Sequence, residues 1–374
     1  MVDRRRIVRM GKQRAARALV TLVHIEGSSY RQPGAHLLIG ADGEYAGTIS
    51  GGCLEAEVVR KAAWMVRNGA IMERYSTLFD DTAEIPFGLG CGGIVDLLLE
   101  PSDTPECRAI VEAMEASLSG AEFRVATWLP HRDQRLARAI FAVNGELIYA
   151  SDSISPDQLA TINGANWTPG ISPGEPHIYR ETLVPPQRLF VLGAGDDAKP
   201  VVAMAAQLGW RITVAEGRAQ LTRPDRFPDA ERVLTASSVA DLGLKTADAA
   251  VIMTHSYEQD RALLIGLLGG SEVPGYIGLL GASHRSSLLV SEAAAALGCS
   301  VAACCDKVWA PVGLDLGGDG AEPIALAVIA EVQAWREGRL GASRRLTAER
   351  VAEQIAKGGA SRYLQTKCAL GDTK

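Results

Sequence analysis

Two cysteines of this chain lie inside short runs of glycine, which is an unusual setting for a structural thiol. Cys53 belongs to the run SGGCLE at residues 50–55, and Cys91 belongs to GLGCGG at residues 88–93. Buried structural cysteines usually pack among bulky apolar side chains, whereas glycine clears space and lets a ligand approach the backbone. Thiolates bind soft metals and can carry sulfur as persulfides. The pattern predicts a site for a bulky, anionic ligand, with Cys53 and Cys91 as candidate metal ligands.

The chain around Cys53 is expected to pass from a strand into a helix. Apolar residues recur at helical spacing over residues 54–67, directly after the cysteine. The positive end of the helix dipole favours the thiolate, and free backbone N–H groups there can hold a phosphate or another oxyanion. Glu55 can accept a proton or a ligand N–H, or it can simply stabilise the start of the helix.

A third glycine loop follows a strand-like run in the C-terminal half. Residues 192–198 read LGAGDDA, the GxGxxA variant of the dinucleotide-binding motif, with Gly193 and Gly195 as its glycines. Glu216 ends the next strand, near the spacing of the acid that contacts a ribose. Together these features predict a Rossmann fold. The two aspartates after Gly195 would repel a pyrophosphate, which favours a Rossmann scaffold that does not use NAD for hydride transfer.

His255 follows another strand-like run, at an edge where open α/β sheets bind ligands. The sequence contains no Ser-His-Asp signature, HExxH motif or P-loop, so it favours a protein without its own turnover while leaving an enzyme open. The cofactor-binding candidates are Gly51, Gly52, Cys53, Glu55, Cys91, Gly92, Gly93, Gly193, Gly195, Glu216 and His255.

These loops must be positioned by strands and helices in two domains. In the N-terminal half we expect strands over 18–25, 36–39, 44–49, 123–129, 139–143 and 147–149, with helices before the first strand and over 54–67 and 104–118. In the C-terminal half strands over 188–192, 211–215, 249–253, 276–280 and 300–303 alternate with helices. Such alternation predicts a parallel sheet.

The expected fold class is therefore α/β: an N-terminal mixed α/β domain and a C-terminal Rossmann-like, doubly wound parallel sheet. The predicted boundaries are 1–163 for the first domain, 164–187 for a proline-rich linker, 188–336 for the Rossmann-like domain and 337–374 for a helical tail.

Composition excludes several classes of protein. The 374 residues are 47% hydrophobic and 22% charged, with no apolar run long enough to span a membrane and no signal peptide, so we expect a cytoplasmic protein. Both ends of the chain are basic, but no nucleic-acid motif accompanies them. Seven cysteines without a CxxC pair indicate neither a disulfide framework nor structural zinc. The adjacent Cys304 and Cys305 are either a redox-sensitive pair or, as we favour, small residues ending the strand 300–303.

Several longer runs carry a family resemblance. They are EGSS at 26–29, GTISGGCLE at 47–55, GCGG at 90–93, GAG at 193–195, TH at 254–255, YIG at 276–278 and PVGLDLG at 311–317. On these runs the chain resembles the xanthine dehydrogenase accessory family, the XdhC/CoxI-type proteins, over roughly residues 15–335. GGCLE and PVGLDLG are far more specific than the Rossmann glycines.

The resemblance implies a function in cofactor maturation. It implies that the protein binds the molybdenum cofactor (molybdopterin), protects it, supports its sulfuration and delivers it to a xanthine dehydrogenase-type molybdenum hydroxylase, with a cysteine desulfurase as partner. The resemblance also implies that Cys53 and Cys91 take part in binding the cofactor. We expect the cofactor between the two domains, with its phosphate near Gly51-Gly52 or the loop of Gly193.

Two alternatives stay open. One is an NAD(P)-dependent oxidoreductase that uses Gly193, Gly195 and Glu216, although NAD(P) is the less expected cofactor. The other is a persulfide relay in which Cys53 or Cys91 accepts sulfur without molybdenum. A homodimer is compatible with the sequence, but no residue pattern indicates one.

Overall fold

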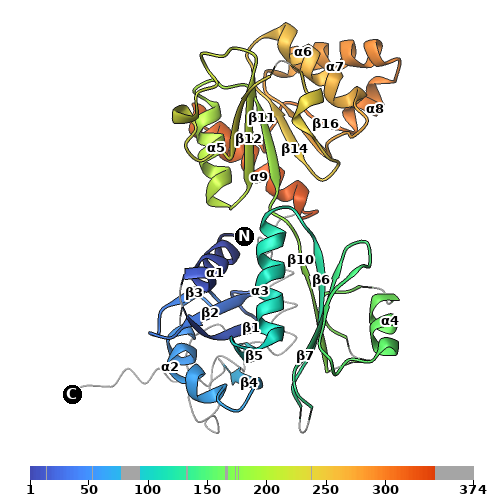
Figure 1. The fold of residues 1–374 in the computed structure, drawn as a ribbon. Coiled ribbons are helices and arrows are strands. Elements are labelled where there is room, and N and C mark those ends of the chain that lie inside the picture. The colour runs from blue at the N-terminus through green and yellow to red at the C-terminus, as the bar shows by residue number, and fades with distance from the viewer. Residues whose placement is uncertain are drawn as a thin grey trace, which may run out of the picture. The chain divides into compact units, whose positions relative to one another are not determined.

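The computed structural model describes residues 1–341 except positions 14, 53, 77–92, 132–133, 165–166, 173, 176 and 237. The chain divides into two compact units, one covering Val2–Pro185 and the other beginning at Pro186. The N-terminal unit has two sheets and the C-terminal unit has one (Figure 1). Each unit also has its own apolar clusters. Of the helical tail expected over 337–374, the residues from 342 on lie outside the described part of the chain.

The N-terminal unit contains a five-stranded antiparallel sheet in the order β3-β2-β1-β5-β4. Its strands are β1 (Ala16–Glu26), β2 (His36–Gly40), β3 (Tyr45–Gly47), β4 (Ile71–Ser76) and β5 (Ile94–Pro101). Helix α2 (Glu55–Met65) packs Val58 and Ala62 on one face, against Val20 and Leu22 of β1. Side chains of β1 that point the other way, such as Leu19, pack with helices α1 (Val2–Gln13) and α3 (Pro105–Leu118). Because both faces are covered, β1 is buried along most of its length.

A second antiparallel sheet in this unit has the order β8-β7-β6-β10-β9. Its strands are β6 (Phe123–Trp128), β7 (Ala137–Ala142), β8 (Leu147–Ala150), β9 (Gly170–Ile171) and β10 (Ile178–Leu183), and helix α4 (Pro156–Gly164) packs on it. Here the structure differs from the linker expected over 164–187, because β10 pairs with β6 along its whole length. The described prolines of this stretch flank β9 and β10 without interrupting them, so they mark strand ends.

The C-terminal unit is a six-stranded parallel sheet in the order β13-β12-β11-β14-β15-β16. The strands are β11 (Arg188–Leu192), β12 (Arg211–Glu216), β13 (Arg232–Thr235), β14 (Ala249–Ile252), β15 (Tyr276–Leu279) and β16 (Val308–Trp309). Helices α5 (Ala198–Gln207) and α9 (Ala321–Arg336) cover one face, while α6 (Tyr257–Gly269), α7 (Ser283–Leu297) and α8 (Val301–Cys305) lie on the other (Figure 1). The predicted Rossmann-like sheet is confirmed.

One predicted element of this unit is wrong. The apolar run at 300–303 predicts a strand, but Ser300 caps helix α8 by accepting a hydrogen bond from the N–H of Ala303 at 3.1 Å. Serine at an N-cap competes with extended structure because its hydroxyl satisfies a free helix N–H. A short apolar run alone does not distinguish the two structures.

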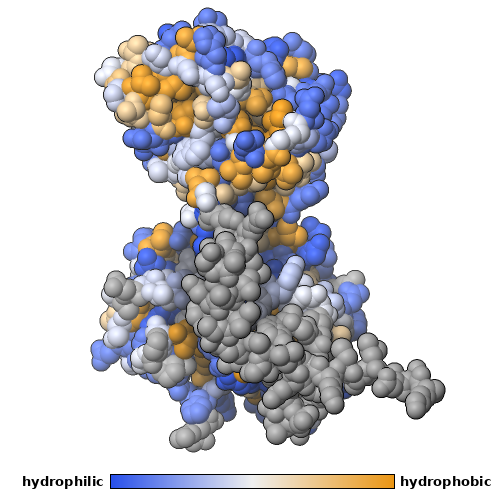
Figure 2. Space-filling view, turned by 180° about the vertical axis from the view of Figure 1, so that it is seen from behind, coloured by the Kyte–Doolittle hydropathy of each residue, from blue (hydrophilic) through white to orange (hydrophobic). Residues whose placement is uncertain are grey.

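None of the helices in the described part of the chain is long and apolar enough to cross a membrane. Exposed large apolar side chains of the C-terminal unit include Leu288, Val301, Leu316 and Leu326. On the face drawn in Figure 2, hydrophobic residues lie among hydrophilic ones on each unit.

Candidate functional site

The loop that leads into α2 is held by the carboxylate of Glu55. Its Oε1 accepts hydrogen bonds from the backbone N–H groups of Ile49 at 3.0 Å and Ser50 at 2.8 Å. The Ser50 hydroxyl donates to Oε2 and also accepts from the N–H groups of Gly52 and Leu54, both at 3.2 Å. Burial tends to raise the pKa of Glu55, but the hydrogen bonds from Ser50 and Ile49 outweigh it and lower the pKa. With 1% of its surface exposed, Glu55 shapes the loop from inside.

Gly51 and Gly52 form the exposed outer surface of this loop. Gly52 has a φ of +108°, and a Cβ on it would meet nothing within 4 Å, so the backbone here borders open space. A Cβ on Gly51 would lie 3.7 Å from the ring of Tyr30. That ring is 74% exposed, so a flat aromatic surface lies beside the glycines. Cys53, the next residue, lies outside the described residues.

The second glycine–cysteine loop ends on the same segment of chain. A Cβ on Gly93 would lie 2.0 Å from the carbonyl oxygen of Ser28 and 3.1 Å from that of Glu26, so only glycine fits. The pairing of β1 with β5, which sets Glu26 opposite Ile94, causes this close approach. Cys91 and Gly92 lie outside the described residues. Nevertheless, the described ends of both loops meet at residues 26–30.

Asp3 of α1 contacts both the turn that carries Tyr30 and the segment that leads into the Gly51–Gly52 loop. Its Oδ2 accepts from the Arg31 guanidinium at 3.0 Å and lies 3.3 Å from the Thr48 hydroxyl. One-third of the Arg31 side chain stays exposed, so a positive charge lies beside the turn that carries Tyr30. A glycine-lined surface, an exposed ring and a cation together suit a ligand that combines a flat ring with an anionic group.

The sequence-based candidates of the C-terminal unit also gather, at the carboxyl ends of β11, β12 and β14. Gly193 has a φ of +132°, and a Cβ there would lie 2.4 Å from the carbonyl oxygen of Met253. Asp197 folds back over Gly195: its Oδ1 lies 2.3 Å from the position of a Cβ on that glycine, and its Oδ2 lies 2.8 Å from Nε2 of His255. His255 takes a left-handed φ of +62°, which is uncommon for a residue other than glycine.

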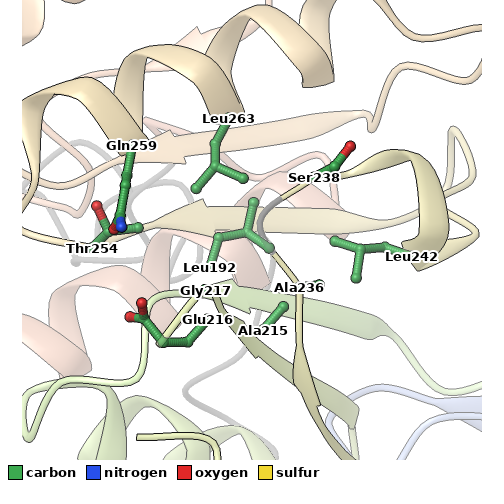
Figure 3. A pocket seen from close by; sticks show the side chains of 10 residues that line it. All are labelled: Leu192, Ala215, Glu216, Gly217, Ala236, Ser238, Leu242, Thr254, Gln259 and Leu263. Carbon is green, nitrogen blue, oxygen red and sulfur yellow. The ribbon is translucent and has the colours of Figure 1, made fainter. Parts of the chain in front are cut away.

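Glu216 lines a hollow in front of this edge (Figure 3). The hollow comprises about 360 Å³ outside protein atoms, part of it open to solvent. Both carboxylate oxygens of Glu216 are already engaged: Oε2 accepts from the N–H of Ala194 at 3.3 Å, and Arg218 donates to both oxygens. Burial tends to raise the pKa of Glu216, but the hydrogen bonds from Arg218 and Ala194 lower it. The remaining walls are mostly apolar, formed by Leu192, Ala215, Ala236, Leu242 and Leu263.

Two aspartates, Asp196 and Asp197, lie at the start of α5, where a dinucleotide places its pyrophosphate. Asp196 pairs with Lys199 at 2.7 Å and with Arg226 at 2.9 Å, and these two partners lower its pKa. Asp197 occupies the space over Gly195. The apolar walls suit a base, but the carboxylate over Gly195 does not suit a pyrophosphate. Among the described residues, no three His, Cys, Asp or Glu side chains are arranged to hold a metal ion.

Two family models match this chain. Residues 11–76 match the XdhC and CoxI family, and residues 189–332 match the XdhC Rossmann domain. The chain belongs to the XdhC/CoxI family. The resemblance predicted from the glycine–cysteine and PVGLDLG runs is therefore confirmed, and we describe the chain as an XdhC-family accessory protein.

Named relatives and a solved structure cover most of the XdhC-family chain. A probable xanthine dehydrogenase subunit from Bacillus subtilis is 28% identical over 324 residues, spanning 84% of this chain and 91% of the relative. The molybdenum cofactor insertion chaperone PaoD of Escherichia coli is 27% identical over 322 residues, spanning 85% and 83%. A crystal structure described as a xanthine dehydrogenase from Bacillus halodurans has a TM-score of 0.75 at 26% identity, covering 94% of this chain and 99% of that one.

Sequence reasoning missed four residues of the N-terminal site: Asp3, Tyr30, Arg31 and Ser50. An aromatic residue in a turn rich in glycine, serine and proline is a signal that would have singled out Tyr30. Asp3 and Ser50 act through contacts that only the fold creates, so no local pattern distinguishes them.

Proposed function

We propose that this XdhC-family accessory protein binds the molybdenum cofactor on its N-terminal unit and delivers it to a molybdenum hydroxylase of the xanthine dehydrogenase type. The observation that carries this proposal is the meeting of both glycine–cysteine loops at residues 26–30. The family match supports it, as does the similarity to a molybdenum cofactor insertion chaperone.

The residues of the site suit the parts of molybdopterin. The exposed ring of Tyr30 offers a face on which a pterin can stack, and Gly51 and Gly52 leave room beside it. Arg31 provides a positive charge for the phosphate, and Asp3 restrains its guanidinium. Glu55 and Ser50 keep the loop in shape from the buried side.

Cys53 and Cys91 are the proposed soft ligands, and Gly92 and Gly93 follow the second of them in the sequence. The bound cofactor would supply molybdenum, held by the two sulfurs of its dithiolene, and the metal has affinity for thiolate sulfur. In this proposal the thiolates shield that centre from water, and a cysteine desulfurase supplies sulfur for sulfuration. Gly193, Gly195, Glu216 and His255 stay secondary candidates for contacts with the cofactor.

An NAD(P)-dependent oxidoreductase is the alternative function. The apolar walls around Glu216 favour it, because they resemble the environment that a nucleotide base needs. The carboxylate of Asp197 over Gly195 argues against it, because a pyrophosphate there would lie beside a negative charge. We therefore favour cofactor delivery.

A pair of tyrosine variants tests the stacking role. The protein is produced in a host that makes molybdopterin, and the pterin retained after purification is oxidised and measured by fluorescence. Tyr30→Ala should lose most of the bound pterin, whereas Tyr45→Ala, which removes another exposed tyrosine of the same unit, should keep it. Equal retention by both variants would remove Tyr30 from the site. Bound NAD(P) without pterin in the wild type would favour the oxidoreductase.

A further inference from the structure

Three cysteines gather where α7 passes into α8. Helix α7 ends at Leu297, and the next residue, Gly298, takes a left-handed φ of +65°. The N–H of Cys299 then donates to the carbonyl of Ala294 at 3.0 Å. Ser300 caps α8, whose last two residues are Cys304 and Cys305. This compact corner brings Sγ of Cys299 to 3.4 Å from Sγ of Cys304.

The two sulfur atoms of this pair have different environments. Cys299 is exposed, whereas Cys304 is 2% exposed and packs with Val290, Ala293 and Val308. Burial and the hydrogen bond to Cys299 raise the pKa of Cys304 to about 11. Cys304 therefore keeps its proton at neutral pH and can donate it in a hydrogen bond to the sulfur of Cys299.

We propose that Cys299 and Cys304 form a thiol–disulfide exchange site, in which exposed Cys299 attacks a small-molecule disulfide and buried Cys304 resolves the product. This site is separate from the proposed cofactor function. It also differs from the redox-sensitive pair considered from the sequence, the adjacent Cys304 and Cys305, for which we favoured two small residues at the end of a strand. Consecutive side chains on a helix point about 100° apart, and Cys305 is exposed while Cys304 is buried.

The exchange balances without a further oxidant. The Cys299 thiolate attacks one sulfur of the disulfide, the S–S bond breaks, and one thiolate leaves. Cys304 then transfers its proton to the small thiolate already released and attacks the sulfur of Cys299, which releases the second thiolate. Two protein thiols and one small disulfide thus give one protein disulfide and two small thiols.

The geometry allows the protein disulfide to close. An S–S bond is about 2.0 Å long, so the present separation of 3.4 Å leaves roughly 1.4 Å to be covered by side-chain rotation and a small shift of α8. The helix has five residues, so few hydrogen bonds oppose such a shift.

Trypsin gives a direct readout, because cleavage after Arg285 and Lys307 releases all three cysteines in one peptide. The reduced, folded protein is incubated with oxidised glutathione, denatured, alkylated with N-ethylmaleimide, digested and sequenced by tandem mass spectrometry. We expect a Cys299–Cys304 disulfide and one maleimide, on Cys305. The protein oxidised in denaturant should instead give a mixture of pairings.

Single variants separate the two roles. Cys304→Ser should retain glutathione on Cys299, Cys299→Ser should gain none on Cys304 while folded, and Cys305→Ser should still form the disulfide. Far-UV circular dichroism checks that each variant is folded. Three maleimides on the wild-type peptide would overturn the proposal, and so would disulfides of Cys305 as abundant as the Cys299–Cys304 disulfide. Both results can be obtained from the wild-type protein alone.

Discussion

Replacing Glu55 with alanine should destabilise the N-terminal unit by several kcal/mol, because one carboxylate holds the loop between β3 and α2. It accepts hydrogen bonds from the N–H groups of Ile49 and Ser50 at 3.0 and 2.8 Å. Ile49 is fully buried, so its N–H would not find water in the variant. The Ser50 hydroxyl would also lose its acceptor.

The magnitude follows from the two backbone hydrogen bonds. A hydrogen bond to a charged group contributes about 1.5–3 kcal/mol, and a buried donor without a partner costs about 1–3 kcal/mol. Only the Ile49 N–H is deeply buried, whereas Ser50 is partly exposed and can bind water. We therefore expect the free energy of unfolding to fall by about 3–5 kcal/mol.

The same contacts predict a dependence on pH. The pKa of Glu55 in the folded protein lies below its usual 4.5, because the hydrogen bonds outweigh the opposite effect of burial. A carboxyl group with a depressed pKa contributes stability that is present above its unfolded pKa and is lost as pH falls through the folded pKa. The difference between wild type and Glu55→Ala should therefore be constant at neutral pH and shrink below pH 4.5.

Native-state hydrogen exchange of the α2 amides is the suitable assay, because it reports on this unit alone. Glu57→Ala is the matched control: it removes a carboxylate from the same helical turn, but one paired with Arg60 and Lys61 at the surface. If Glu55→Ala lowers the protection of α2 no more than Glu57→Ala does, the account of the loop is refuted.

Three further substitutions give sharp expectations. Glu100→Gln should cost about 3–5 kcal/mol in urea unfolding, because it leaves the fully buried Arg138 without its charged partner. Gly93→Ala should abolish retention of molybdopterin, measured by fluorescence, because the added Cβ would lie 2.0 Å from the carbonyl oxygen of Ser28. Asp197→Ser should tighten NAD(H) binding about fivefold in calorimetric titration, because it removes the carboxylate over Gly195, whose repulsion of a nearby pyrophosphate charge is about 1 kcal/mol in water.

Each of these expectations has a control and a contradicting result. Glu115→Gln removes an exposed carboxylate paired with Lys12 and should change the free energy of unfolding little. If Glu100→Gln and Glu115→Gln lowered it equally, the prediction for Glu100 would be contradicted. For Gly93→Ala the control is Gly69→Ala. Gly69 has a positive φ, but no atom lies within 4 Å of an added Cβ, so this variant should keep the pterin. Unchanged NAD(H) affinity in Asp197→Ser would show that this carboxylate does not block the loop.

The C-terminal sheet could be predicted because its signals are local. Strands alternating with helices and the loop containing Gly193 and Gly195 require no knowledge of distant contacts. The prediction of a strand over 300–303 was wrong for a local reason too. The Ser300 hydroxyl accepts a hydrogen bond from an N–H at the start of α8, and a pattern of apolar residues contains no information on such a cap. Strand β10 was missed because the prolines on either side of it indicated a linker, and because its pairing with β6, a strand far away in the sequence, cannot be deduced locally.

The N-terminal site could be predicted only in part. The glycines identified the loops, but the register of β1 against β5 decides that Gly93 approaches Ser28. The burial of Glu55 decides that it positions the loop, and neither property can be derived from neighbouring residues. The exposed ring of Tyr30 likewise depends on where its turn is anchored.

The most direct test of the central proposal is the molybdenum and molybdopterin content of the purified full chain, produced in a host that makes the cofactor. The wild type and Cys305→Ala, which removes an exposed cysteine of the other unit, should retain both in equal proportion. Cys53→Ala and Cys91→Ala should lose the molybdenum. Wild-type protein that retains neither molybdenum nor pterin, or cysteine variants that retain both, would contradict the account.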